Sequence, residues 1–354
     1  MRSPISLAQY LADTLSGASH AESLAALLLS VANTSIAIAG LVSKGGLSDL
    51  SGKLSSQNVQ GETQTQLDLI ANQLFIQDLM ASGLVAGLVS EEMDSAIEVT
   101  AGAPFLVAFD PLDGSSNIAV NVAIGSIFSV LNAPHDHVPT EADYLQAGSQ
   151  QIAAAYALYG PSTMFVLTVG KGTCGFTLDS QLGQYVLTHS NMRIPEACSE
   201  FAINASNVNY WEAPIQRYIE DCQAGEAGPR GRAFNMRWVA SLVADIHRIL
   251  IRGGVYLYPK DNKLPTKAGR LRLLYEVNPM GMLIEQAGGK STTGRKSLLE
   301  VVPSEIHQRL PMIVGSHQEV ALIERYYQNF DAGSSHAQGS PLFGKRSLFH
   351  KNSH

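Results

Sequence analysis

The first third of the chain alternates between helical spacing and short apolar runs. Leucine and valine recur every three or four positions over 23–42, and a second helix is expected over about 65–80. Glycines follow both segments, as they commonly do at helix ends. The runs 84–89 and 105–109 are almost wholly apolar, which is typical of buried strands. This order predicts an α/β arrangement.

The middle of the chain has a different pattern. From Ser126 to Leu187, short β-prone runs recur between Gly, Pro and Asn residues, which favours an antiparallel part of a sheet. The expected strands are Ile127–Leu131, Ala153–Leu158, Met164–Val169 and Gly175–Leu178.

Beyond Asn191, strands and helices alternate. The expected strands are Phe201–Asn204 and Val255–Tyr258, and the expected helices are Ile215–Cys222, Trp238–Ile251 and Asn278–Ala287. This change predicts two domains, 1–192 and 193–331. The segment 332–354 is rich in Ser, Gly and His without apolar periodicity, and we expect it to be a disordered tail.

Composition narrows the function classes. Apolar residues make up 45% of the 354 residues and charged residues 16%, so a large core is expected. The net charge of −7 gives no support for binding to nucleic acid or to a membrane surface. No uninterrupted apolar run reaches the roughly 18 residues typical of a membrane span. The three cysteines lack disulfide or metal spacing, and no leader pattern is visible, so a cytoplasmic protein with reduced thiols is expected.

The most informative stretch is 109–117. It places Asp110 and Asp113 on a turn stiffened by Pro111, at the carboxyl end of a predicted buried strand. Open α/β sheets usually bind ligands at that edge. The small residues Gly114–Ser116 follow at once, and their backbone amides are suited to an anion. The stretch predicts a metal site beside a phosphate site.

Other carboxylates are expected to join this pair. The full set is Asp68, Glu91, Glu92, Asp110, Asp113 and Glu276. If the strands that end before Glu91 and Asp110 are parallel neighbours, these carboxylates meet, and their repulsion calls for cations. Oxygen ligands without His or Cys favour Mg²⁺ or Mn²⁺ over zinc. Two alternatives remain open: solvated surface acids for Glu91-Glu92, and a Ca²⁺ loop, although no EF-hand spacing is present.

The motif 110–115 resembles the signature of the lithium-sensitive, magnesium-dependent phosphatases, and further motifs narrow the resemblance to class 1 fructose-1,6-bisphosphatase. The likeness covers about residues 5–330. The matching motifs are Asn58–Gly61, Leu67-Asp68, Ser90–Glu92, Phe109–Ile118, Val243–Arg248, Leu257–Pro259, Leu271–Glu276 and Asn278–Met280. The resemblance implies a five-layer α-β-α-β-α sugar-phosphatase fold with two mixed sheets.

The resemblance also implies an activity, the magnesium-dependent hydrolysis of fructose 1,6-bisphosphate to fructose 6-phosphate and phosphate. Two or more Mg²⁺ ions, which Mn²⁺ can replace, would be held by Glu91, Asp110, the Leu112 carbonyl, Asp113 and Glu276. Asp68 and Glu92 would orient and deprotonate the attacking water. The 1-phosphate would meet Asp113, Gly114, Ser115 and Ser116.

The implied site for the distal phosphate and the sugar lies in the second half of the chain, at Asn204, Arg237, Tyr258 and Arg270. In the family the arginine that matches Arg237 reaches into a neighbouring subunit, so the resemblance implies a homo-oligomer, expected to be a tetramer. Glu62 and Arg272 match partners in the closure of a mobile loop.

Two departures from the family affect regulation and specificity. Where relatives inhibited by AMP carry Thr-Gly-Glu-x-Thr and a Lys-Tyr pair, this chain has 21–25 (Ala-Glu-Ser-Leu-Ala) and Pro104-Phe105, so AMP insensitivity is expected. In the distal pocket, Trp238, Arg270 and Asn207 replace the usual Tyr, Lys and Tyr.

The altered pocket is similar to that of bacterial Calvin-cycle enzymes, some of which also act on sedoheptulose 1,7-bisphosphate. Dual specificity therefore stays open, as does the choice between gluconeogenesis and carbon fixation. An inositol-monophosphatase-like activity is a distant alternative, and a non-catalytic binding module ranks last, because Asp68 and Glu92 are both present.

Overall fold

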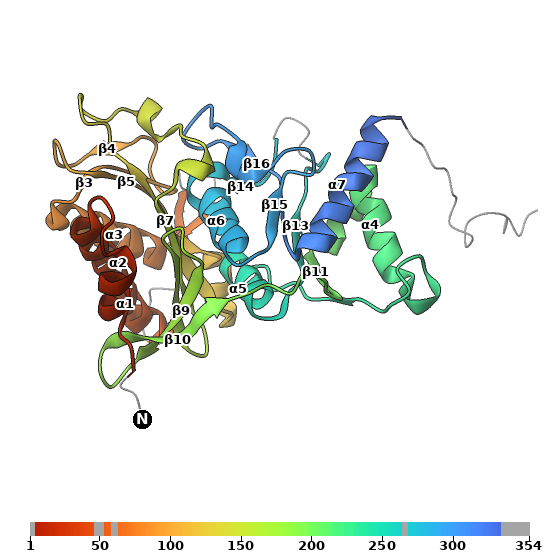
Figure 1. Ribbon diagram of the computed structural model, residues 1–354, viewed down its shortest axis with the longest axis horizontal. Coiled ribbons are helices and arrows are strands. Elements are labelled where there is room, and N and C mark those ends of the chain that lie inside the picture. The colour runs from red at the N-terminus through yellow and green to blue at the C-terminus, as the bar shows by residue number, and fades with distance from the viewer. Residues whose placement is uncertain (1–3, 46–52, 58–62, 264–267, 334–354) are drawn as a thin grey trace, which may run out of the picture.

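The computed structural model describes residues 4–45, 53–57, 63–263 and 268–333. These residues form five layers (Figure 1): three helices, an eight-stranded sheet, two helices, a five-stranded sheet and two outer helices. The predicted α/β fold with two mixed sheets is confirmed. The predicted disorder after residue 333 concerns a segment outside the described residues.

The first helical layer packs on the larger sheet. It contains α1 (Leu7–Leu15), α2 (Ala21–Val42) and α3 (Gln66–Ser82). By length and hydropathy α2 alone, within the described part of the chain, could cross a membrane. Its leucines at 24, 27 and 28 are buried in the core that the three helices share with the sheet, so α2 is a core helix.

The larger sheet carries the predicted acidic strand ends. Its order is β10-β9-β8-β7-β6-β5-β3-β4. The strands are β3 (Val85–Ser90), β4 (Ile97–Glu98), β5 (Phe105–Asp113), β6 (Ile124–Asn132), β7 (Ala153–Tyr159), β8 (Thr163–Thr168), β9 (Thr173–Asp179) and β10 (Gln184–Met192). Strands β3 and β5 run parallel, which meets the condition for bringing the carboxylates together, and the strands from β5 to β10 are joined antiparallel, as predicted for 126–187.

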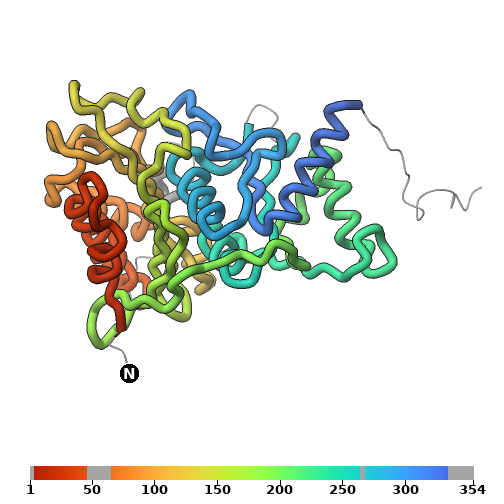
Figure 2. The backbone as a smooth tube through the Cα atoms, in the orientation of Figure 1, coloured from red at the N-terminus to blue at the C-terminus, as the bar shows by residue number. Residues whose placement is uncertain are grey.

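A second sheet follows after residue 192, and Figure 2 shows the connection from β10 running along the molecule to reach it. Its order is β12-β11-β13-β17-β15, from β11 (Glu200–Ile203), β12 (Asn235–Met236), β13 (Val255–Tyr258), β15 (Lys290–Thr292) and β17 (Met312–Gly315). Between the sheets lie α5 (Leu242–Arg252) and α6 (Asn278–Gln286), and outside lie α4 (Ala213–Gln223) and α7 (His317–Asp331).

Two short pairings complete the described elements, β1 (Lys53–Gln57) with β2 (Thr63–Thr65), and β14 (Leu271–Arg272) with β16 (Arg309–Leu310). The pairing of β14 precedes a π-helical turn at Leu273–Val277 that contacts β5 and β6. This return of the chain brings a segment from the second half of the sequence onto the larger sheet.

Two local predictions were wrong. Asp110 and Asp113 do not lie on a turn, because β5 continues through them, with a register shift between these two residues. A bulge of this kind accommodates a proline inside a sheet. The helix expected from Trp238 begins only at Leu242, since Ala240 has a left-handed backbone (φ 65°) that no helix continues.

Candidate metal centre and phosphate pocket

The carboxyl ends of β3 and β5 bring the first carboxylates together. The Glu91 amide donates to the Phe109 carbonyl (3.1 Å), so Glu91 leaves its strand beside the end of β5. On β5 the Leu112 amide donates to Asp110 Oδ1 (2.9 Å), and the Ser126 hydroxyl donates to the Pro111 carbonyl (2.7 Å). These bonds hold the bulged strand end in one shape and fix the direction of Asp110.

Glu276 reaches the same place from the second half of the chain. It lies in the π-helical turn, a distortion found frequently at functional sites. The Arg272 amide donates to Glu276 Oε2 (2.6 Å), which fixes the carboxylate. Carboxylate oxygens of Asp110, Asp113 and Glu276 all lie within 4.8 Å of one another, and the three side chains are buried.

This concentration of acids alters their protonation. Burial, followed by the charges of Glu91, Asp113 and Glu276, raises the pKa of Asp110 well above its usual range. Burial also raises the pKa of Asp113 to about 7, although the amide of Val243 opposes the shift by donating to Asp113 Oδ2 (3.0 Å). Keeping these buried carboxylates ionised therefore costs free energy, and a bound cation would offset that cost.

Arg272 is one cation inside the cluster. The residue is 6% exposed, and its guanidinium lies 2.6 Å from Glu91 and 3.6 Å from Glu276. The sequence predicted Arg272 only as a partner of Glu62 in loop closure, and Glu62 lies outside the described residues. The contact with metal-site carboxylates was missed, because the motif that carries Arg272 gives no sign of which carboxylates it will meet.

The expected water-activating residues come from a helix start and from a strand end. Asp68 is 3% exposed, in the first turn of α3, where Oδ2 accepts the Thr65 amide (2.6 Å) and hydroxyl (2.9 Å). Burial raises the pKa of Asp68, while the hydrogen bonds from Thr65 and Ser115 oppose the shift. Glu92 is half-buried directly after β3, and its amide donates to the Ser90 hydroxyl (3.2 Å).

The small residues predicted to form an anion cradle lie directly after β5. Gly114 has φ 76° and begins a 3-10 helix at Ser115–Val120. Its first amides have no carbonyl of their own helix to bind, so they are suited to a phosphate oxygen. Ser115 is half-buried and Ser116 is exposed. The hydrogen bond of Ser115 to Asp68 connects the cradle to a candidate catalytic carboxylate.

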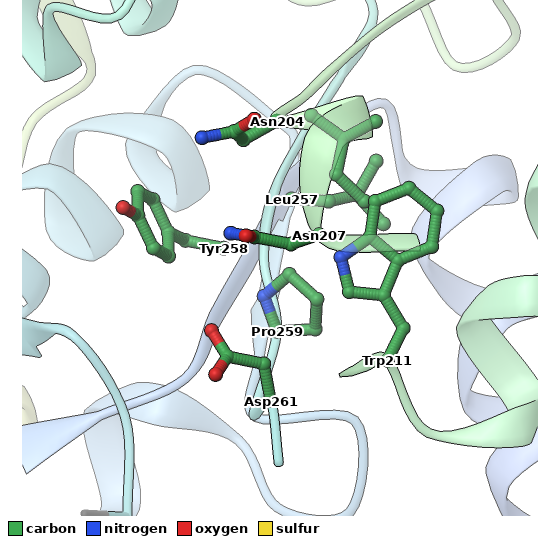
Figure 3. A pocket seen from close by; sticks show the side chains of 8 residues that line it. Asn204, Asn207, Trp211, Leu257, Tyr258, Pro259 and Asp261 are labelled. Atoms are coloured by element: carbon green, nitrogen blue, oxygen red, sulfur yellow. The ribbon is translucent and has the colours of Figure 1, made fainter. Parts of the chain in front are cut away.

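Asn204 and Tyr258, two of the four residues predicted at the distal phosphate, line one small pocket (Figure 3). The residues around it are Ile203, Asn204, Asn207, Trp211, Leu257, Tyr258, Pro259 and Asp261. Figure 3 shows the Asn204 amide, the Tyr258 hydroxyl and the Asp261 carboxylate on the side away from the Trp211 ring. The pocket therefore has one polar side and one apolar side.

The two predicted arginines are placed differently. Arg270 lies at the edge of this pocket, where its guanidinium contacts both carboxylate oxygens of Asp261 at 3.1–3.2 Å. Asp261 was not predicted, although the short polar segment after Pro259 places this carboxylate near Arg270 in the sequence. Arg237 is not among the residues that line the pocket, and it is exposed just after β12.

The donor set fits a hard divalent cation. Three buried carboxylates converge, two with raised pKa values, and each supplies oxygen ligands of the kind that Mg²⁺ and Mn²⁺ prefer. A surface solvated by water alone would not bury these side chains to between 3% and 8% exposure. The solvated-surface alternative concerned Glu91 and Glu92, and the burial of Glu91 to 6% exposure does not support it for that residue.

Comparisons with known proteins agree with this geometry. The models of the fructose-1-6-bisphosphatase N-terminal and C-terminal domains match residues 6–190 and 194–328. Fructose-1,6-bisphosphatase class 1 3 of Methylibium petroleiphilum is 54% identical over 328 residues, 92% of this chain and 91% of that protein. The class 1 enzyme of Hydrogenophilus thermoluteolus is 53% identical over 329 residues, with the same coverage of each chain.

Solved structures are similar over the same length. The crystal structure of Leishmania major fructose-1,6-bisphosphatase in holo form has a TM-score of 0.86 and 35% identity, covering 92% of this chain and 99% of that one. The apo form gives a TM-score of 0.82 and 34% identity, covering 92% and 100%.

Proposed function

The chain belongs to the class 1 fructose-1,6-bisphosphatase family and is a fructose-bisphosphatase, and from this premise we propose how its residues divide the work. The observation that carries the proposal is the buried convergence of Asp110, Asp113 and Glu276 beside the cradle at Gly114–Ser116. We assign the 1-phosphate to this place, and the distal phosphate and sugar to Asn204, Tyr258, Arg270 and, from a second subunit, Arg237.

The metal ligands are proposed to be Glu91, Asp110, the Leu112 carbonyl, Asp113 and Glu276. Two or more Mg²⁺ ions, when bound there, would neutralise charge on the attacking and leaving oxygens of an in-line displacement. The amides of the cradle would hold the phosphate oxygens, and Arg272 would balance the charge of Glu91 and Glu276.

Asp68 and Glu92 are proposed to position and deprotonate the water. A base is most effective when its pKa lies near the working pH, and the burial of Asp68 shifts its pKa in that direction. The bonds from Thr65 hold Asp68 Oδ2, and together with the bond from Ser115 they fix the orientation of this carboxylate. The proton would pass to the carboxylate as the new P–O bond forms and the bond to the sugar O1 breaks.

The lining of the distal pocket leads us to propose a second substrate. Asn207 lines the pocket at the position where the family's usual residue is the larger tyrosine. A smaller side chain leaves room for one more carbon of the sugar, so sedoheptulose 1,7-bisphosphate is a second candidate substrate. Gluconeogenesis or the Calvin cycle would be the setting, depending on which substrate is used.

Substrate preference tests the proposal. We expect kcat/KM for fructose 1,6-bisphosphate to exceed that for myo-inositol 1-phosphate by about 10²-fold or more, because the latter leaves Arg270 and its neighbours without an anion. Phosphate release is the measurement. Equal kcat/KM values for the two substrates would contradict the assignment of the distal phosphate to this pocket. A preference for fructose over sedoheptulose bisphosphate beyond about a thousandfold would reject dual specificity.

We also predict insensitivity to AMP. Helix α2 begins at Ala21 with the exposed, acidic Glu22 in its first turn, where a negative charge would repel a phosphate. Phe105 is 1% exposed inside β5 and offers no cation. The inhibition constant should lie above about 1 mM. Titrating AMP into the phosphate-release assay is the check, and inhibition in the micromolar range would contradict the prediction.

The remaining proposals concern organisation. We propose a cytoplasmic homotetramer of two-domain subunits, with a boundary near residue 192. The exposure of Arg237 supports a neighbour at that face. The three cysteines are buried and free, which suits a reducing compartment.

A further inference from the structure

One short segment, residues 237–243, contacts both the distal pocket and the metal centre; we call it the strap. Near its start, the Trp238 ring stacks on Tyr256 with centroids 5.8 Å apart and lies 5.9 Å from the Tyr258 ring, which lines the pocket. At its end, the Val243 amide donates to Asp113 Oδ2 (3.0 Å). The strap therefore makes direct contacts with a residue of each site.

Three side chains fix the backbone of the strap. Asn117 Nδ2 donates to the Ala240 carbonyl (2.8 Å), and Asp245 Oδ2 accepts the Val239 amide (3.1 Å). Arg248 Nη2 donates to the Arg237 carbonyl (3.2 Å). Between these points Ala240 adopts φ 65°, a region unfavourable for alanine that persists only where the surroundings enforce it. The strap is held in one conformation by its neighbours.

The strap also lies close against the phosphate cradle. A Cβ added to Gly114 would meet the Ser241 hydroxyl at 3.1 Å, so little free space separates the two backbones. Asn117 itself belongs to the 3-10 helix that the cradle begins. The bond from Asn117 to the strap therefore links the element that would hold the 1-phosphate to the element beside the distal pocket.

We propose that the strap transmits occupancy of the distal pocket to Asp113 and the cradle, and that Asn117 and Asp245 are the positioning residues that make this coupling possible. The proposal rests on the distal-phosphate pocket assigned above. Binding energy from a remote part of a substrate can raise kcat when it fixes the geometry of the reacting groups. The strap is the physical connection through which binding of the second phosphate could fix the geometry of the reacting groups and so raise kcat.

The test compares kcat for fructose 1,6-bisphosphate with kcat for fructose 1-phosphate, at saturating Mg²⁺, in the full-length protein. Asn117→Ala should lower the ratio of the two kcat values by roughly tenfold, as expected when one hydrogen bond that matters only to the bisphosphate is lost. Asn117→Gln, which retains the amide donor, should restore part of the ratio. Asn329→Ala, an exposed change on α7, is the matched control and should leave the ratio unchanged.

The outcomes separate this inference from the proposed function. A wild-type ratio near one would overturn the distal pocket and the coupling together. A large wild-type ratio that Asn117→Ala preserves, or an equal loss on both substrates, would overturn the coupling alone. If Asn117→Ala does not fold, Asp245→Ala, which removes the acceptor for the Val239 amide, should lower the same ratio, and an unchanged ratio would overturn the coupling.

Discussion

Asp113→Asn should lower kcat/KM for fructose 1,6-bisphosphate by roughly 10³-fold while leaving the protein folded. The amide removes one charge from a proposed metal ligand, and its nitrogen cannot coordinate Mg²⁺. The remaining oxygen can still accept the Val243 amide, so the contact between β5 and α5 is kept. Phosphate release measures the loss, and a Mg²⁺ titration should show weaker activation.

The stability of this variant distinguishes a functional effect from misfolding. Burial opposes the charge of Asp113 and raises its pKa to about 7, so the metal-free Asp113→Asn variant should have a Tm at pH 8 no lower than that of the wild type. Asp13→Asn, at an exposed position of α1, is the control and should change neither rate nor Tm. Near wild-type activity of Asp113→Asn would rule out Asp113 as a ligand.

The edge of the sheet that carries the site was predictable, but the local backbone was not. The apolar run before Asp110 predicts a buried strand, and the parallel neighbour that delivers Glu91 follows from the same kind of run. Pro111 suggests a turn to a reader of the sequence alone, because prolines are common in turns. The strand continues because the Ser126 hydroxyl of β6 donates a hydrogen bond to the Pro111 carbonyl. These two residues are 15 positions apart in the chain.

The start of α5 shows a second limit. Apolar spacing continues through Trp238 and Val239 as though they were helical. In the structure the Val239 amide instead donates a hydrogen bond to Asp245. The helix begins after Ser241, and serine is a residue type favoured at the N-cap of a helix. The serine was the available signal. No local sequence pattern indicates that the Val243 amide will donate a hydrogen bond to Asp113, which lies far away in the chain.

The placement of Arg272 shows a third limit, which is charge balance at long range. The resemblance connects this arginine to a loop residue, whereas the structure brings it within 2.6 Å of Glu91, a residue far away in the sequence. Repulsion among the carboxylates predicts that some cation must lie between them. Arg272 is that cation because the chain returns to the larger sheet through β14 and the π-helical turn. This return is a property of the whole fold and cannot be predicted from the local sequence.

Removal of the metal should abolish turnover and make the stability of the protein depend strongly on pH. EDTA should reduce phosphate release to background, and Mg²⁺ or Mn²⁺ should restore it, because Arg272 alone cannot replace ions that clamp the transferred phosphate. Activity that survives EDTA would contradict the whole assignment of the site. The same cluster determines what happens to the fold when its ions are gone.

The folded pKa of Asp113, about 7, lies above the ordinary value of 3.8, and that of Asp110 is raised too. The metal-free folded state thus binds more protons than the unfolded state between about pH 4 and pH 7. The contribution of these two carboxylates to the stability of the metal-free fold should be fully present below that range and should be lost as the pH rises through it. Mg²⁺ binds the deprotonated carboxylates, and at a hundred times its Kd would add about 2.7 kcal/mol. The rise in Tm on adding Mg²⁺, followed by differential scanning fluorimetry, should therefore be larger at pH 8 than at pH 6. A smaller rise at pH 8 would mean that these carboxylates do not bind the ion.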